Sequence, residues 1–141
     1  MLARLHARVG KTTNDNVLTQ TGNREDFEAN IRPRIGESGF MLFFEIDHGR
    51  WIENYGIERR LLRWIFGNPL IAITMLQHDY TAGLFVPIEL LLAESDDGKT
   101  CNITCLVPSS LIATGNNPQL RAAALALDAK AEALIVSAVT A

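Results

Sequence analysis

The stretch of residues 64–87 constrains the fold most, because it predicts a strand, a short helix and a second strand in immediate succession. A sharp corner is expected at Gly67, since Asn68 suits a helix N-cap and Pro69 suits the first helical position. Apolar residues at helical spacing follow: Leu70, Ile73 and Leu76. A glycine turn then leads into a strand near Pro87. Polar residues at the two ends of this helix therefore lie where binding sites tend to be built.

Four further runs predict the sheet. The apolar run 40–47 has strand length and is expected to be a central strand, buried on both faces over much of its length. Residues 61–66 predict the next strand. Residues 87–94 and 100–107 predict a hairpin, because the Asp97-Gly98 pair favours a tight turn. The first hairpin strand is apolar on both faces, so its second face is expected to need a cover, either a helix or another subunit.

The last part of the sequence predicts a long helix. Asn117 suits its N-cap and Pro118 its first position. Small and apolar residues then recur at steps of three and four: Leu120, Ala124, Leu127, Ala131, Leu134 and Ala138. Charged residues occupy other positions, so this helix is expected to lie on the sheet. A short helical turn is predicted before it, at residues 108–113.

The first residues carry weaker patterns. Residues 1–16 are expected to be an irregular lead-in, followed by a single domain over residues 17–141. An organelle transit peptide is the alternative for the lead-in, because it is rich in arginine and has no acid before Asp15. Gly10-Lys11-Thr12 matches only the tail of a phosphate-binding loop, whose first glycine is replaced by Leu5.

Residues 17–35 predict a short strand and a helix. The strand is expected at residues 17–21. The helix is expected to start at Asn23, with Asp26 three residues later in the manner of a capping box. Pro33 is expected to kink or end that helix.

Composition excludes several classes of protein. The 141 residues have the size of one domain, and 48% hydrophobic residues allow a core without disulfides or metal. A net charge of -3 argues against binding to nucleic acid. No apolar run approaches the ~20 residues of a membrane span. No secretory segment is found near Met1, so a cytoplasmic location is expected.

The two cysteines are interpreted as packing residues. Cys101 and Cys105 lie four residues apart in one expected strand, which separates them by ~13 Å. A disulfide needs Cα atoms within about 7 Å, so the two are not expected to bond. Without nearby histidines they are also a poor metal site, and no metal is expected.

Asp47 and His48 end the strand at residues 40–47 and are the first candidate site residues. An imidazole there has a pKa near neutrality and could serve as an acid-base group, an anion contact or a metal ligand. The structural alternative is that His48 caps the strand while Asp47 fixes its tautomer. On the pattern alone the structural alternative is preferred.

Asn68 and His78, at the two ends of the predicted short helix, complete the candidate set. His78 alone is better explained by the helix dipole, since it falls at a helix C-terminus. A local basic excess could draw an anionic ligand toward His48, although such a run is more often a solvated face. The arginines of that run are Arg50, Arg59, Arg60 and Arg63.

Four runs of residues resemble the DUF302 family, whose function is uncharacterised: GFMLFFEIDHG (39–49), FGNPLIAITMLQHD (66–79), AGLFVPIELLLAE (82–94) and LDAKAEAL (127–134). The resemblance covers roughly residues 22–137. It implies an α+β two-layer sandwich, with helices on a mixed, largely antiparallel sheet, commonly as a homodimer. It also implies that Asp47, His48, Asn68 and His78 gather near strand ends. One branch of the family has cysteines where this chain has Gly67 and Ile88, so a thiol role does not transfer.

Two hypotheses for function follow. The first is a non-catalytic homodimeric module that binds a small ligand, for which an anion is a candidate, or a protein partner near Asp47, His48, Asn68 and His78. The second is a hydrolase-like or metal-assisted enzyme, in which Asp47 orients His48 and His78 with Asp79 completes the constellation. Binding is preferred, because the sequence has no nucleophile elbow, no His-Glu-x-x-His and no glycine-rich phosphate loop. No cofactor is assigned.

Overall fold

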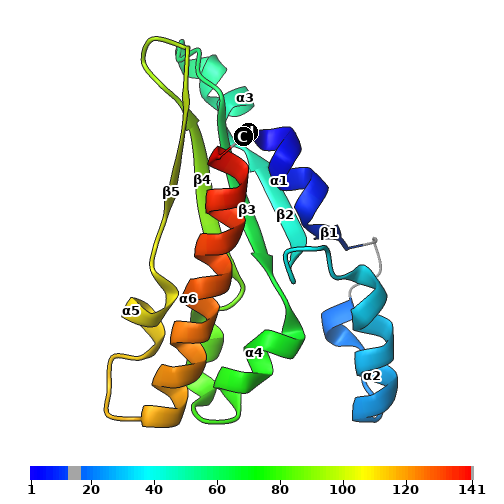
Figure 1. Ribbon diagram of the computed structural model, residues 1–141. Helices are drawn as coiled ribbons and strands as arrows, with labels where there is room; N and C mark the ends of the chain where they lie inside the picture. The colour runs from blue at the N-terminus through cyan, green and yellow to red at the C-terminus, as the bar shows by residue number, and fades with distance from the viewer. Residues whose placement is uncertain (13–16, 141) are drawn as a thin grey trace.

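The computed structural model describes residues 1–12 and 17–140. Its centre is a sheet with the strand order β1-β2-β3-β4-β5 (Figure 1). β1 pairs in parallel with β2, and the other neighbours pair antiparallel. The strands are β1 (Gly10–Lys11), β2 (Met41–Asp47), β3 (Leu61–Gly67), β4 (Ile88–Glu94) and β5 (Cys101–Cys105). The mixed, largely antiparallel sheet that was expected is therefore present.

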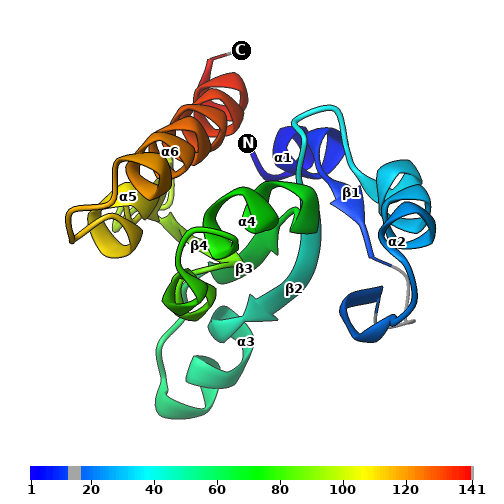
Figure 2. The same ribbon diagram turned by 90° about the horizontal axis from the view of Figure 1, so that it is seen from below.

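Helices form a second layer on one face of this sheet. Figure 2 shows α1 (Leu2–Arg8) and α6 (Pro118–Val139) on the same side of the strands, with α3 (His48–Ile52) on the opposite side. α4 (Pro69–Leu76) lies at the end of the sheet where β3 finishes, beside the first turns of α6, and α5 (Pro108–Ile112) packs against α6 on its other side. The α+β two-layer sandwich is confirmed.

The main core lies between the sheet and these helices. Trp64 and Phe66 of β3 are fully buried there, as are Leu90 and Leu92 of β4. The predicted stripe of α6 supplies the opposing layer, since all six of its small and apolar residues are buried. Leu5 of α1 is also fully buried in this core.

A second, smaller core lies under α2 (Arg24–Ile31), beyond the edge of the sheet. Ile31 of α2 packs there with Val17 and Met41, and Leu70 of α4 lies against the group. The remaining short helices are η1 (Val17–Thr19), η2 (Arg32–Arg34), η3 (Glu53–Tyr55) and η4 (Tyr80–Leu84). α2 and α4 are thus held near each other by one apolar cluster.

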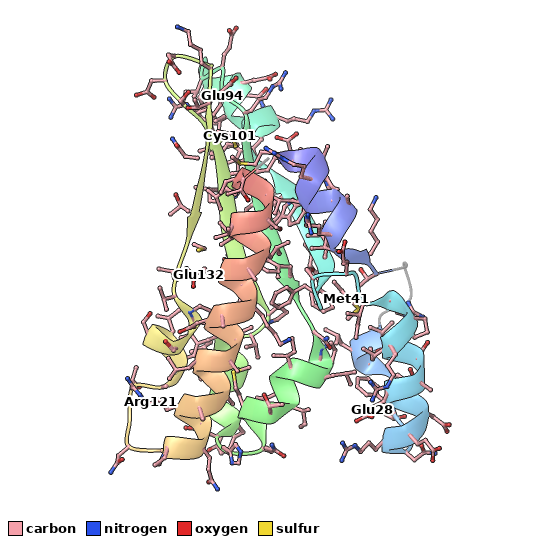
Figure 3. The ribbon with its side chains drawn as sticks, viewed as in Figure 1. Glu28, Met41, Glu94, Cys101, Arg121 and Glu132 are labelled. Carbon is pink, nitrogen blue, oxygen red and sulfur yellow. The ribbon has the colours of Figure 1, made fainter. Side chains whose placement is uncertain are left out.

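Most element boundaries that rest on local signals are confirmed. Asn23 caps α2 by accepting from the backbone N–H of Asp26 at 2.8 Å, and α2 ends just before the turn that contains Pro33. Asn68 and Asn117 cap α4 and α6, each with a proline in the first position. The two predicted hairpin strands are β4 and β5. Glu94 and Cys101 are the last paired residues before the turn that joins them (Figure 3).

Three expectations are wrong. Residues 2–11, expected to be irregular, form α1 and β1, although residues 13–16 of that segment lie outside the described residues. The strand expected at residues 17–21 is instead the 3₁₀ turn η1. β2 is not buried on both faces, because Phe44 is 65% exposed. The domain boundary between residues 16 and 17 stays a prediction.

The face of the sheet opposite α1 and α6 is open over its middle. Arg63 and Glu89 form an ion pair there, with Arg63 Nε 2.9 Å from the carboxylate. Register places the apolar residues Phe44, Ile65 and Leu91 around this pair. We call this surface, with Phe44, Arg63, Ile65, Glu89 and Leu91, the open sheet face. The cover expected for the second face of the hairpin is partial, since Leu84 of η4 and Leu111 of α5 border a hollow that Leu91 also lines.

Candidate functional site

Asp47 and His48 lie where β2 passes into α3, and both have structural partners. The Asp47 carboxylate caps α3 by accepting from the backbone N–H of Arg50 at 3.1 Å. His48 Nδ1 accepts the indole N–H of Trp51 at 3.0 Å. Asp47 therefore caps a helix. Both interpretations from the sequence had paired Asp47 with the His48 ring, and that pairing is absent. The two observed contacts nevertheless favour the structural interpretation, because each side chain bonds within α3.

His48 does not lie beside Asn68. β2 and β3 are antiparallel, so Met41 pairs with Gly67 while Asp47 pairs with Leu62. Six residues of chain separate Leu62 from Asn68, which is about 20 Å at ~3.3 Å per residue. Figure 1 shows α3 and α4 at opposite ends of the sheet. The expectation that these two residues share one pocket is therefore wrong.

Asn68 is buried and holds the corner between β3 and α4. Its Oδ1 accepts from the backbone N–H of Leu70 at 2.8 Å, and its Nδ2 donates to the carbonyl of Gly39 at 2.8 Å. Among the residues that the structure describes, it is the one polar or charged residue that is buried. Because a buried amide is costly unless both its ends are bonded, these two bonds explain why it is tolerated there.

His78 lies just beyond the other end of α4, about 12 Å from its start for eight residues at 1.5 Å each. Its carbonyl accepts from the Asn117 side chain at 3.3 Å, which ties this turn to the start of α6. The neighbouring Asp79 accepts from the Thr81 hydroxyl at 2.6 Å and from the Thr81 backbone N–H at 2.9 Å. These bonds hold the pKa of Asp79 below its usual value. The predicted residues thus occupy three separate places.

A groove with a volume of about 1080 Å³ lies between α2 and α4. We call it the α2–α4 groove. Its apolar wall comes from η1, α2, β2, α4 and the segment before β4, and includes Leu18, Phe27, Phe43, Leu70, Ile73 and Val86. Of the four predicted site residues, only Asn68 lines it. The second core, which holds α2 near α4, therefore also shapes the groove.

Charged residues of α2 and η2 form one rim of this groove. Glu28 accepts from Arg24 Nε at 2.8 Å and from Arg32 Nη2 at 3.0 Å. The hydrogen bond from Arg24, reinforced by Arg32, outweighs partial burial and holds the pKa of Glu28 below its usual value. Figure 3 shows Glu28 on α2, at the end of the molecule where α4 also lies. One carboxylate thus faces two guanidinium groups.

Comparison with known proteins fits this fold. The model of a family described as "Domain of unknown function DUF302" matches residues 16–138. The chain belongs to this family. A crystal structure of an uncharacterized conserved DUF302 protein from Bacillus stearothermophilus is similar, with a TM-score of 0.62 and 22% identity, over 83% of this chain and 91% of that one. No curated protein matches the chain.

The charged rim of this DUF302 chain was missed by sequence reasoning, although a signal was available. Arg24, Glu28 and Arg32 follow one another at a spacing of four, which places them on one side of a helix. The apolar wall of the α2–α4 groove could not be predicted from sequence spacing, because its residues come from segments far apart in the sequence.

Residues 1–12 and 17–140 contain no group of three His, Cys, Asp or Glu side chains that could hold a metal ion. None of the helices in those ranges is long and apolar enough to cross a bilayer. Both cysteines are free, with Cys101 half-buried and Cys105 exposed, so the packing role expected for Cys105 is wrong.

Proposed function

We propose that this DUF302 chain is a non-catalytic homodimeric binding module, whose α2–α4 groove receives a small ligand. The observation that carries the proposal is the groove itself, which has a mainly apolar wall and a charged rim. Its 1080 Å³ is slightly above the range of about 300–1,000 Å³ that is usual for small-molecule sites. In this proposal Asn68, one of the predicted site residues, forms part of the groove wall.

The enzyme alternative has less support than binding. It requires Asp47, His48 and His78 to act on one substrate, whereas the strand register places Asp47 and His48 at one end of the sheet and α4 with His78 at the other. Ligand contacts by these three residues stay a prediction. A cytoplasmic location, as the sequence predicts, agrees with the two free cysteines.

Ligand binding in the groove can be tested with the neutral fluorescent probe N-phenyl-1-naphthylamine. The protein is expected to raise the emission of the probe, and Ile73→Asp is expected to weaken probe binding about tenfold or more, since a carboxylate would then interrupt the apolar wall. Ile73 is 51% exposed, so the variant is expected to fold.

Leu125→Asp is the matched control, because Leu125 is 48% exposed on α6 and does not line the groove. It is expected to bind the probe as the wild type does. An unchanged probe affinity in Ile73→Asp, or no probe binding by the wild type, would contradict the groove as the binding site.

The open sheet face supports the homodimeric part of the proposal. Phe44 is 65% exposed at its edge, next to the paired Ile65. Apolar side chains that surround a central ion pair suit a two-fold contact, since Arg63 of each copy could then meet Glu89 of the other. A second copy would also complete the cover of β4.

Phe44→Asp is expected to convert the dimer to monomers, because each copy would then bury a carboxylate without a partner in an apolar contact. Sedimentation velocity at micromolar concentration measures the change. Leu125→Asp again serves as control and should remain dimeric. A monomeric wild type, or a Phe44→Asp protein that stays dimeric, would exclude this interface.

A further inference from the structure

The chemistry of the α2–α4 groove narrows the class of ligand, if the groove binds a ligand as proposed above. Several polar side chains of the wall are already hydrogen-bonded within the fold. Asn68 bonds to Gly39 and Leu70, and the Thr74 hydroxyl donates to the carbonyl of Ile71 at 2.6 Å. These groups leave the middle of the groove to apolar contacts. The part of a ligand that lies there is therefore apolar.

At the rim the balance of charge is positive. Glu28 is the one acid among the described residues that line the groove, and Arg24 and Arg32 are its two basic residues. Glu25 and Asp26 belong to the same helix but do not line the groove. One carboxylate cannot neutralise two guanidinium groups, so the rim carries a net charge of about +1.

The two arginines also retain hydrogen-bonding capacity. Arg24 contacts Glu28 through Nε, which leaves its terminal amino groups outside that bond, and Arg32 contacts Glu28 through one terminal nitrogen. Each guanidinium has five N–H donors. The Arg24 and Arg32 side chains are 88% and 65% exposed, so an incoming anion can reach them.

We infer that the ligand of this groove is an anionic amphiphile, with a carboxylate head at Arg24 and Arg32 and a single apolar chain along the wall. The excess positive charge disfavours a cationic head, and a neutral head would gain no charge-assisted hydrogen bond in exchange for the water on the exposed arginines. An apolar chain of about ten carbons can lie along α4, since the eight residues of that helix extend about 12 Å.

The test is displacement of N-phenyl-1-naphthylamine by decanoate, decanol and decyltrimethylammonium, which share one chain and differ in the charge of the head. Decanoate is expected to displace the probe at about one-fifth of the concentration of decanol, the value for one exposed charged contact. The cationic compound is expected to be the weakest. Octanoate should bind about tenfold more weakly than decanoate, because two methylenes fewer are buried.

Variants of the rim residues test whether the carboxylate head binds there. Arg24→Gln combined with Arg32→Gln should abolish the preference for decanoate and leave the affinity for decanol unchanged. Glu28→Gln should increase that preference, because it removes the carboxylate that competes for both arginines. This gain cannot come from misfolding. Arg121→Gln is the matched control, since Arg121 lies on α6 away from α2 (Figure 3) and should behave as the wild type.

Two results would overturn the inference, and a third would remove the proposed function on which it rests. Equal displacement by decanoate and decanol would exclude an anionic head while leaving the groove as a binding site. A preference that survives the double arginine variant would place the head elsewhere. Failure of the wild type to bind the probe at all would instead remove the proposed function itself.

Discussion

Gly36→Ala is expected to lower the free energy of unfolding by about 3 kcal/mol or more. A Cβ atom at Gly36 would overlap the backbone nitrogen of Gly10 and lie 2.5 Å from the carbonyl oxygen of Arg8. These are backbone atoms, so no side-chain rotation can relieve the overlap. The segment joining α1 to β1 would have to move away from the loop that contains Gly36.

That movement would break a set of backbone hydrogen bonds. The N–H groups of Gly10 and Gly36 both donate to the carbonyl of Phe40, at 2.8 and 3.0 Å, and the N–H of Ser38 donates to the carbonyl of Arg8 at 3.0 Å. Because Leu5 lies in the main core, the first helix would be displaced as well. The loss is therefore expected to exceed that of an ordinary glycine substitution.

Urea denaturation followed by circular dichroism measures the difference. Gly115→Ala is the matched control, because a Cβ atom at Gly115 would meet nothing within 4 Å. It should change stability by no more than about 0.5 kcal/mol. Equal stability of the two variants would mean that the N-terminal segment does not pack as the structure places it.

The same region shows why local patterns were insufficient at the start of the chain. α1 has seven residues and contributes one buried residue, Leu5, so it shows no helical stripe of the kind that identified α6. β1 is two residues long and is held by Met41 and Leu42, about thirty positions later. Gly10, which resembled part of a phosphate-binding loop, is better explained by the close approach of the Arg34 backbone.

Capping signals were reliable because they act over two or three residues. Asn23, Asn68 and Asn117 each accept a backbone N–H at the start of their own helix, and each of these helices was predicted. The fold class came from the resemblance, which the family match and the DUF302 crystal structure confirm. Local rules and resemblance together therefore gave most of the helices and strands.

The prediction that the candidate site residues lie together was wrong for a different reason. Strands that follow one another usually pair antiparallel, so the end of the first lies beside the start of the second. Applied to residues 40–47 and 61–66, this rule already places Asp47 near Leu62 and far from Asn68, as the register shows. The groove itself could not be inferred, since it depends on how α2 packs against α4.

Trp64→Ala is expected to destabilise the protein by about 3–5 kcal/mol, the usual cost of removing a large buried aromatic side chain. Trp64 is fully buried at the centre of the main core, where β3 lies beneath the helices. Its ring lies against that of His6 of α1, with the centroids 4.8 Å apart. Removal of the indole would leave a cavity that rigid sheet and helix backbones could close only in part.

The indole also has a polar contact, which Trp64→Phe separates from packing. Trp64 Nε1 donates to Glu45 at 2.6 Å, and the same carboxylate lies 3.0 Å from His6 Nε2. Trp64→Phe keeps most of the packing and loses this bond, so it is expected to cost about 1–2 kcal/mol. Trp51→Ala is the matched control, because Trp51 is 53% exposed, and it should cost less than about 1 kcal/mol. Urea midpoints of the three variants would contradict this ranking if Trp51→Ala proved as costly as Trp64→Ala, since burial would then not decide which of the two tryptophans stabilises the domain.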